Sequence, residues 1–134
     1  PVPSELAQAW GLSDFYQQHL DLGGLPILSS ELVDPQAHVV ACQIAKHMLV
    51  ERPDVHQELI DNHIRIGIMS VDEVTTDIPE HADLYDVFPG VDWDVRARGL
   101  GATLDRPACG RRDQTGPAAP ASPPERWPPT GAPC

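Results

Sequence analysis

The chain has 134 residues, of which 22% are charged and only 5% are aromatic, and it carries a formal net charge of −11. A chain this acidic repels phosphate backbones and anionic lipid, which disfavours binding to nucleic acid or to a membrane surface. No stretch of about 18 or more apolar residues is present, so the sequence predicts no transmembrane helix. No signal peptide is visible, and the compartment, secreted or not, stays open.

Composition divides the chain near residue 110. Residues 111–134 contain seven prolines and a single aromatic side chain, Trp127. Such a segment buries too little apolar surface to offset its loss of conformational entropy, so we expect a disordered tail rich in proline, alanine and arginine. Residues 1–110 carry 18 acidic and six basic side chains and are long enough for one modest core. We therefore predict one domain over residues 1–110, followed by the tail over residues 111–134.

Helix patterns occupy the first half of the chain. Residues 4–20 are typical of one or two short helices. Asp34 followed by proline marks the start of a long helix, whose apolar residues recur at three- and four-residue steps as far as about residue 51. Pro53 then opens another helix, which we expect to end near Asn62, a residue that tolerates the left-handed conformation.

Two strands flank these helices in the sequence. Residues 25–29 form a short apolar run, and residues 64–71 alternate isoleucine with other side chains, as in a half-buried strand packed on a helix. Gly67 within that strand indicates close approach of another backbone. Residues 83–92 are expected to form an extended surface loop, and residues 98–103 to supply an edge strand. The predicted fold class is α+β, a small sheet with one long and one or two short helices packed on it.

The polar loop at residues 75–81 contains the strongest candidates for chemistry. Glu80 and His81 could act as acid and base, or as ligands. The competing interpretation is structural, with Asp77 bonding nearby backbone to set a turn and with Arg96 and Arg98 pairing the acids. The structural interpretation is favoured because no nucleophile or metal cluster accompanies the loop.

The six histidines do not form a recognisable metal motif. His38 and Cys42 share a helix face, but a zinc site needs three or four converging ligands. No His-Glu-x-x-His sequence occurs in the chain. We expect Cys42 to be a small core residue. Four histidines are expected to face solvent or to cap helices: His38, His47, His56 and His63.

Five motifs occur in an order that resembles one family. They are Asp14-Phe15-Tyr16, Gly24-Leu25-Pro26-Ile27-Leu28-Ser29-Ser30, Glu51-Arg52-Pro53-Asp54, Thr75-Thr76-Asp77-Ile78-Pro79-Glu80-His81 and Arg96-Ala97-Arg98-Gly99-Leu100-Gly101-Ala102-Thr103. This series resembles the first part of a group of bacterial and fungal zincin-like metallopeptidases, similar to the catalytic domain of anthrax lethal factor. The resemblance covers about residues 13–109, and the fourth and fifth motifs are its most specific parts.

That resemblance implies a zinc-dependent peptidase for the complete domain. In the family, the His-Glu-x-x-His helix that holds the zinc follows this segment. Here the pattern ends after Cys109-Gly110, in a way that resembles a frame change in a GC-rich gene. The resemblance therefore implies an incomplete domain that is inactive as this chain and supplies no metal ligands. Thr76, Asp77, Arg96 and Arg98 would form a wall of the metal cleft.

Two other functions stay open beside the incomplete peptidase domain. One is an acidic interaction module that binds a protein or peptide through the surface of residues 75–94. The other is a metal-independent enzyme that uses Glu80 and His81. An incomplete domain would also leave apolar surface uncovered on the strand at residues 64–68 or the helix at residues 40–48, and we expect self-association through that surface.

Overall fold

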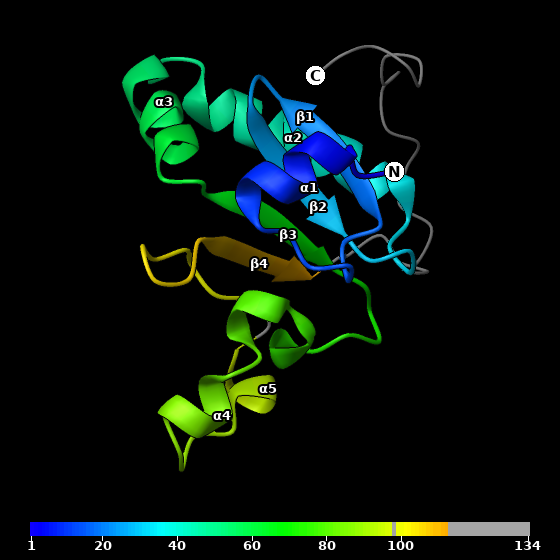
Figure 1. The fold of residues 1–134 in the computed structure, drawn as a ribbon, viewed down its shortest axis with the longest axis vertical. Coiled ribbons are helices and arrows are strands. Elements are labelled where there is room, and N and C mark those ends of the chain that lie inside the picture. Colours follow the sequence, from blue (N-terminus) through cyan, green and yellow to red (C-terminus); the bar gives the residue numbers. More distant parts are fainter. Residues whose placement is uncertain (98, 113–134) are drawn as a thin grey trace, which may run out of the picture.

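The computed structural model describes residues 1–97 and 99–112. Within them, four strands form one mixed sheet in the order β1-β2-β3-β4, with helices packed around it (Figure 1). The strands are β1 (Gln18–Leu22), β2 (Leu25–Ser29), β3 (Arg65–Met69) and β4 (Ala108–Arg112). The helices are α1 (Ser4–Trp10), α2 (Pro35–Leu49), α3 (Pro53–Asp61), α4 (Leu84–Val87) and α5 (Trp93–Arg96), and two 3-10 turns are η1 (Thr75–Asp77) and η2 (Pro79–His81). The predicted α+β class is confirmed.

The segment after α1 forms a hairpin where a second helix was expected. β1 pairs antiparallel with β2 through the two-residue turn Gly23-Gly24. Both glycines have positive φ angles, 55° and 95°, as tight hairpin turns of the primed types require. The prediction of a helix reaching residue 20 is therefore wrong, because the paired glycines close a hairpin and do not end a helix.

β2 and β3 run parallel, so the chain crosses over between them through α2 and α3. α2 begins as predicted, with Oδ1 of Asp34 accepting the amide of Gln36 at 2.8 Å and Pro35 at the first helical position. The end of α3 differs from the prediction. Asn62 has a φ of −90°, and the left-handed residue is His63, with a φ of 54°.

A core of small and branched apolar side chains lies between α2 and the sheet. Its buried members are Leu22, Leu25, Ile27, Val33, Ala37, Cys42, Ala45 and Ile68. Cys42 is fully buried, which confirms the prediction that it is a core residue. His38 is also buried, at 5% exposed, because it lies one turn before Cys42 on the same helix face. The expectation that His38 faces solvent is therefore wrong, whereas His47 is exposed as expected.

The other two of these four histidines each contact a distant part of the chain. Nε2 of His56 lies 2.9 Å from the carbonyl oxygen of Leu22, which ties α3 to β1. The ring of His63 is exposed and stacks on Trp10 at a centroid distance of 4.9 Å, which holds the end of α1. In Figure 1, α1 is drawn in front of the sheet and α2 behind it.

β3 is covered on both faces, where a half-buried strand was expected. Ile66 and Ile68 pack on the α2 side. Arg65, Gly67 and Met69 point to the opposite face and are buried there, at 6% exposed for the arginine and 1% for the methionine. The reason is that Ile78, Glu80 and Tyr16 pack on the second face, where Glu80 pairs with Arg65 and Ile78 lies over Gly67.

The fourth strand is β4, and the described residues 99–103 contain no strand. β4 runs parallel to β3 and extends two residues past the boundary that composition places at residue 110. The rest of the expected tail, residues 113–134, lies outside the described residues.

The loop expected at residues 83–92 contains the one-turn helix α4, and α5 follows it. No helix in the described part of the chain is long and apolar enough to span a membrane.

Candidate functional site

The polar loop lies on the face of the sheet opposite α2, and two glycines make this possible. Gly67 of β3 and Gly110 of β4 are register partners. A Cβ atom at Gly67 would lie 3.5 Å from Cδ1 of Ile78, and one at Gly110 would lie 3.9 Å from both Ile78 and the His81 ring. The side chains of Ile78 and His81 therefore occupy the space above Gly67 and Gly110, two residues without side chains. The close approach predicted at Gly67 is made mainly by side chains, with the nearest backbone atom outside its own strand, the Cys109 carbonyl oxygen, at 3.9 Å.

Glu80 joins three segments in the interior. Its Oε2 accepts a hydrogen bond from the Tyr16 hydroxyl at 2.5 Å, and its Oε1 lies 2.7 Å from Nε of Arg65. The arginine and glutamate side chains are only 7% and 10% exposed. The Nε–H of Arg65 is not aligned with an acceptor among the described residues, so this contact is an ion pair without a directed hydrogen bond at that atom. Nη1 of Arg65 donates to the carbonyl of Trp10 at 3.2 Å.

The surroundings of Tyr16 keep its hydroxyl group protonated. Burial raises the pKa of the Tyr16 hydroxyl far above its ordinary value, and the negative charge of Glu80 raises it further. The phenol therefore remains a donor to the carboxylate. Both oxygens of Glu80 are engaged inside the protein, whereas a general base needs one within reach of a substrate proton.

His81 packs as a neutral ring against the sheet. The side chain is 1% exposed, and within the described part of the chain neither ring nitrogen has a hydrogen-bond partner of acceptable geometry, although the Ala108 backbone approaches the ring. Burial lowers the pKa of His81 below 6.5, and the nearby carboxylates of Glu80 and Asp83 oppose that shift only in part. The imidazole is therefore a packing group above Gly110.

Hydrogen bonds at η1 fix the start of the loop. Oδ2 of Asp77 accepts the amide of Val74 at 2.8 Å, which confirms the predicted turn-setting bond. The amide and hydroxyl of Thr76 both lie 3.0 Å from Oδ1 of Asp94 and donate to it. Thr75 donates its hydroxyl to a backbone carbonyl just after α5. These bonds tie η1 to α5, two elements that are distant in the sequence.

The arginines pair with the acids differently from the prediction. The guanidinium of Arg96 lies over the Trp93 ring, 5.5 Å from its centroid, and is not part of an ion pair among the described residues. Arg98 lies outside the described residues. Among the described residues, Glu80 of the loop pairs with Arg65, and Asp83, just beyond the loop, pairs with Arg106, whose Nη2 is 2.9 Å from both of its Oδ atoms.

Sequence reasoning missed Arg65 and Tyr16, although a signal for the arginine was present. Arg65 alternates with the isoleucines of β3, so its side chain must point away from the α2 core. A cation on a strand that is also covered on its second face needs a buried acid as partner. Nothing local in the sequence indicates that Glu80 is that acid, because the pairing spans the loop between them.

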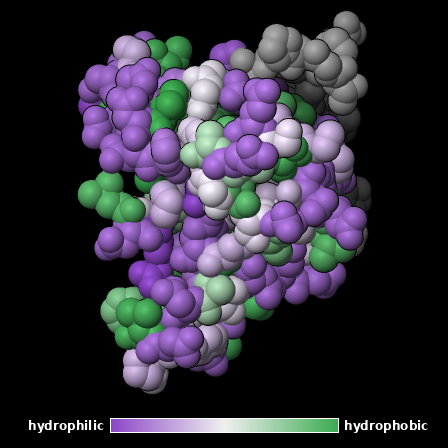
Figure 2. Space-filling view, viewed as in Figure 1, coloured by the Kyte–Doolittle hydropathy of each residue, from purple (hydrophilic) through white to green (hydrophobic). Residues whose placement is uncertain are grey.

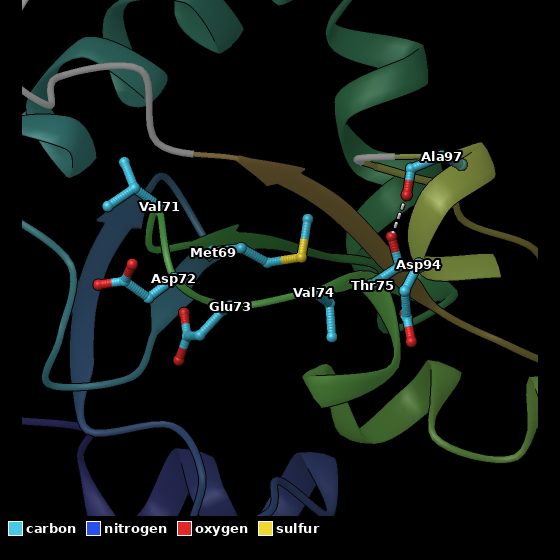
Figure 3. A pocket seen from close by; sticks show the side chains of 8 residues that line it. All are labelled: Met69, Val71, Asp72, Glu73, Val74, Thr75, Asp94 and Ala97. Atoms are coloured by element: carbon cyan, nitrogen blue, oxygen red, sulfur yellow. Dashed lines mark hydrogen bonds between the residues drawn. The ribbon is translucent and has the colours of Figure 1, made fainter. Parts of the chain in front are cut away.

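A pocket of about 110 Å³ lies beside η1, between the segment that follows β3 and the helix α5 (Figure 3). Met69 and Val74 supply apolar lining, and the carboxylates of Asp72, Glu73 and Asp94 supply negative charge. Two of these carboxylates, those of Glu73 and Asp94, already accept backbone amides. Neither member of the predicted acid–base pair lines this pocket.

The described side chains do not fit a zinc site. Within residues 1–97 and 99–112, no group of three or more histidine, cysteine, aspartate or glutamate side chains gathers in a way that could hold a metal ion. We therefore derive no reaction step through zinc for these residues.

A scan against protein-family models found no match, and comparisons with curated proteins and with solved structures found none either. The resemblance to zincin-like metallopeptidases therefore stays a prediction from motifs.

Proposed function

We propose that this chain is a non-catalytic part of a zincin-like metallopeptidase domain, the part that borders the zinc-binding helix. The observation that carries the proposal is the role of Glu80. Its carboxylate is buried against Arg65 and Tyr16, so the acid of the most family-specific motif holds the loop on the sheet. The wall of a catalytic cleft must be held rigidly in this way, because a site works only when the residues around it are fixed.

The surface of the loop supports the same function. Thr76 is half-buried, while Asp77 and Arg96 are exposed, so three of the four residues predicted for the cleft wall reach the surface. The buried residues of the loop thus hold it on the sheet, and the exposed residues form a polar surface. A neighbouring catalytic element would meet the polar surface.

Sequencing the gene beyond the codon for Cys109 tests this proposal. We expect a His-Glu-x-x-His pattern in one of the reading frames downstream of that codon. A gene that encodes no such pattern in any frame on that side would contradict the proposed kinship.

The alternative of a metal-independent enzyme has little geometric support. Glu80 and His81 would have to leave their packed positions to meet a substrate, because their side chains are 10% and 1% exposed. Removing Glu80 would leave the buried charge of Arg65 unpaired, which is costly in a protein interior.

We infer a second candidate function, the binding of a protein through the surface of residues 75–94. The observation that favours it is a group of large hydrophobic side chains exposed among acidic residues. Tyr85, Val87 and Phe88 are 42%, 51% and 48% exposed. A gathering of apolar side chains at a surface marks an interaction site. This function needs no zinc-binding helix.

A further inference from the structure

Residues 83–96 form a small lobe that extends beyond β4, at the bottom of Figure 1, and we call it the α4–α5 lobe. Its own contacts keep it ordered. The Tyr85 hydroxyl lies 2.9 Å from Oδ1 of Asp92 and 3.1 Å from Oδ2 of Asp94. Phe88 meets Trp93 edge to face at a centroid distance of 6.0 Å. The surface of the lobe is therefore preformed, which lowers the entropic cost of binding.

The lobe presents large apolar side chains to solvent although its backbone is fixed. Val95 is 79% exposed, in addition to the half-exposed Tyr85, Val87 and Phe88. Figure 2 shows hydrophobic side chains gathered on the lower part of the molecule, over this lobe. Leu84, by contrast, is buried at 3% exposed and anchors α4. Tyr85 and Phe88 thus help to hold the lobe together and still expose nearly half of their surface, and Val87 and Val95 add to the exposed apolar surface.

The charge around these side chains selects the partner. Residues 83–96 contain four aspartates and one arginine, and the whole chain has a net charge of −11. Arg106 pairs with Asp83 and lies 5.9 Å from the centroid of Phe88, so Asp86, Asp92 and Asp94 are the lobe acids outside an ion pair among the described residues. An acidic surface attracts a basic partner and repels anionic lipid, nucleic acid and a second copy of itself. The apolar side chains require that the partner also bring an apolar group.

We propose that the α4–α5 lobe is a docking surface for a short basic segment of another protein, in which an apolar side chain lies beside lysine or arginine. The proposal rests on the second candidate function and names the class of its partner. The lobe spans few residues and is smaller than a stable interface requires, so the complex is a transient one. The apolar side chain covers Val87, Phe88 and Val95, and the cations face Asp86 and Asp92.

Nuclear magnetic resonance titration of the ¹⁵N-labelled chain with three short synthetic peptides tests this proposal. The first peptide alternates lysine with leucine, the second replaces each lysine by glutamate, and the third replaces each leucine by serine. We expect the first peptide to shift amide signals of residues 83–96 and to bind at least about tenfold more tightly than the other two.

Variants locate the binding surface. Val95→Ser should weaken binding of the lysine–leucine peptide about tenfold without changing the fold, because the Val95 side chain is 79% exposed. Met48→Ser, which alters a 71% exposed side chain on α2, is the matched control and should leave binding unchanged.

The proposal is overturned if the peptide shifts signals elsewhere, if the glutamate peptide binds equally well, or if no shift occurs at millimolar peptide. It is also overturned if the chain sediments with phosphatidylcholine vesicles and Val95→Ser abolishes that sedimentation. None of these results depends on a zinc-binding motif downstream in the gene. A result that overturns the docking proposal therefore does not overturn the proposed kinship with metallopeptidases, and the reverse also holds.

Discussion

Replacing Glu80 by glutamine should destabilise the protein strongly, because the positive charge of Arg65 would remain buried without its partner. Breaking a buried ion pair from one side typically costs about 3–5 kcal/mol. Urea unfolding followed by circular dichroism measures this loss. The exposed pair of Arg52 and Asp54 provides the control, and Asp54→Asn should leave the unfolding midpoint nearly unchanged. A Glu80→Gln protein as stable as the wild type would contradict the structural role of the carboxylate.

His81 should make the folded protein sensitive to mild acid. Burial holds the pKa of His81 below 6.5, so the unfolded chain binds a proton that the folded chain resists. The stabilising contribution is complete above pH 6.5 and is lost as the pH falls below that value. We expect the free energy of unfolding, measured in urea, to decrease between pH 7.5 and about pH 5.

Two variants separate His81 from other groups in this pH range. His81→Leu cannot take up a proton, so its stability should depend less on pH. A smaller slope should remain, because burial also lowers the pKa of His19. Met48→Ser alters an exposed side chain that carries no titratable group and should keep the full slope. An unchanged slope in His81→Leu would show that the ring is not the group that titrates.

At the scale of elements, the hairpin between β1 and β2 depends on Gly24. Its φ is 95°, and a Cβ atom there would lie 3.1 Å from Cδ1 of Ile60. Gly90 provides a matched control, because its φ is 91° and a Cβ atom there would have no atom of the described residues within 4 Å. Both alanine variants should lose about 1–2 kcal/mol from backbone strain. Gly24→Ala should lose more, measured by thermal unfolding, because α3 must also shift. Equal losses would mean that the Ile60 contact carries no strain.

Local signals in the sequence predict some of these elements well and others poorly. Asp34 and Pro35 mark the start of α2, and the alternating isoleucines mark β3, because each signal acts over a few neighbouring residues. The sequence does not predict β1, because a diglycine can follow the end of a helix as well as close a hairpin. β4 was missed because its place is set by parallel pairing with β3, a contact that no nearby residue encodes. The pairing of Glu80 with Arg65 and Tyr16 cannot be predicted for the same reason, because it also joins residues that are distant in the sequence.

At the scale of the whole molecule, net charge and exposed apolar surface have opposite effects on self-association. Ile44 and Met48 lie one turn apart on α2 and are 41% and 71% exposed. The net charge of −11 keeps copies apart at low salt, and salt screens that repulsion. Sedimentation velocity should therefore detect more self-association in high salt, and Met48→Glu should reduce it. A chain that stays monomeric at every salt concentration would contradict the predicted self-association.

Calorimetric titration of the chain with zinc tests the central claim most directly, because that claim gives Glu80 and His81 structural roles and no role as ligands. We expect no saturable binding of one equivalent, since His81 is buried and, among residues 1–97 and 99–112, no converging set of ligands surrounds it. Stoichiometric binding of zinc with submicromolar affinity, lost in His81→Gln, would contradict the account. It would place a metal centre in the loop at residues 75–81 itself.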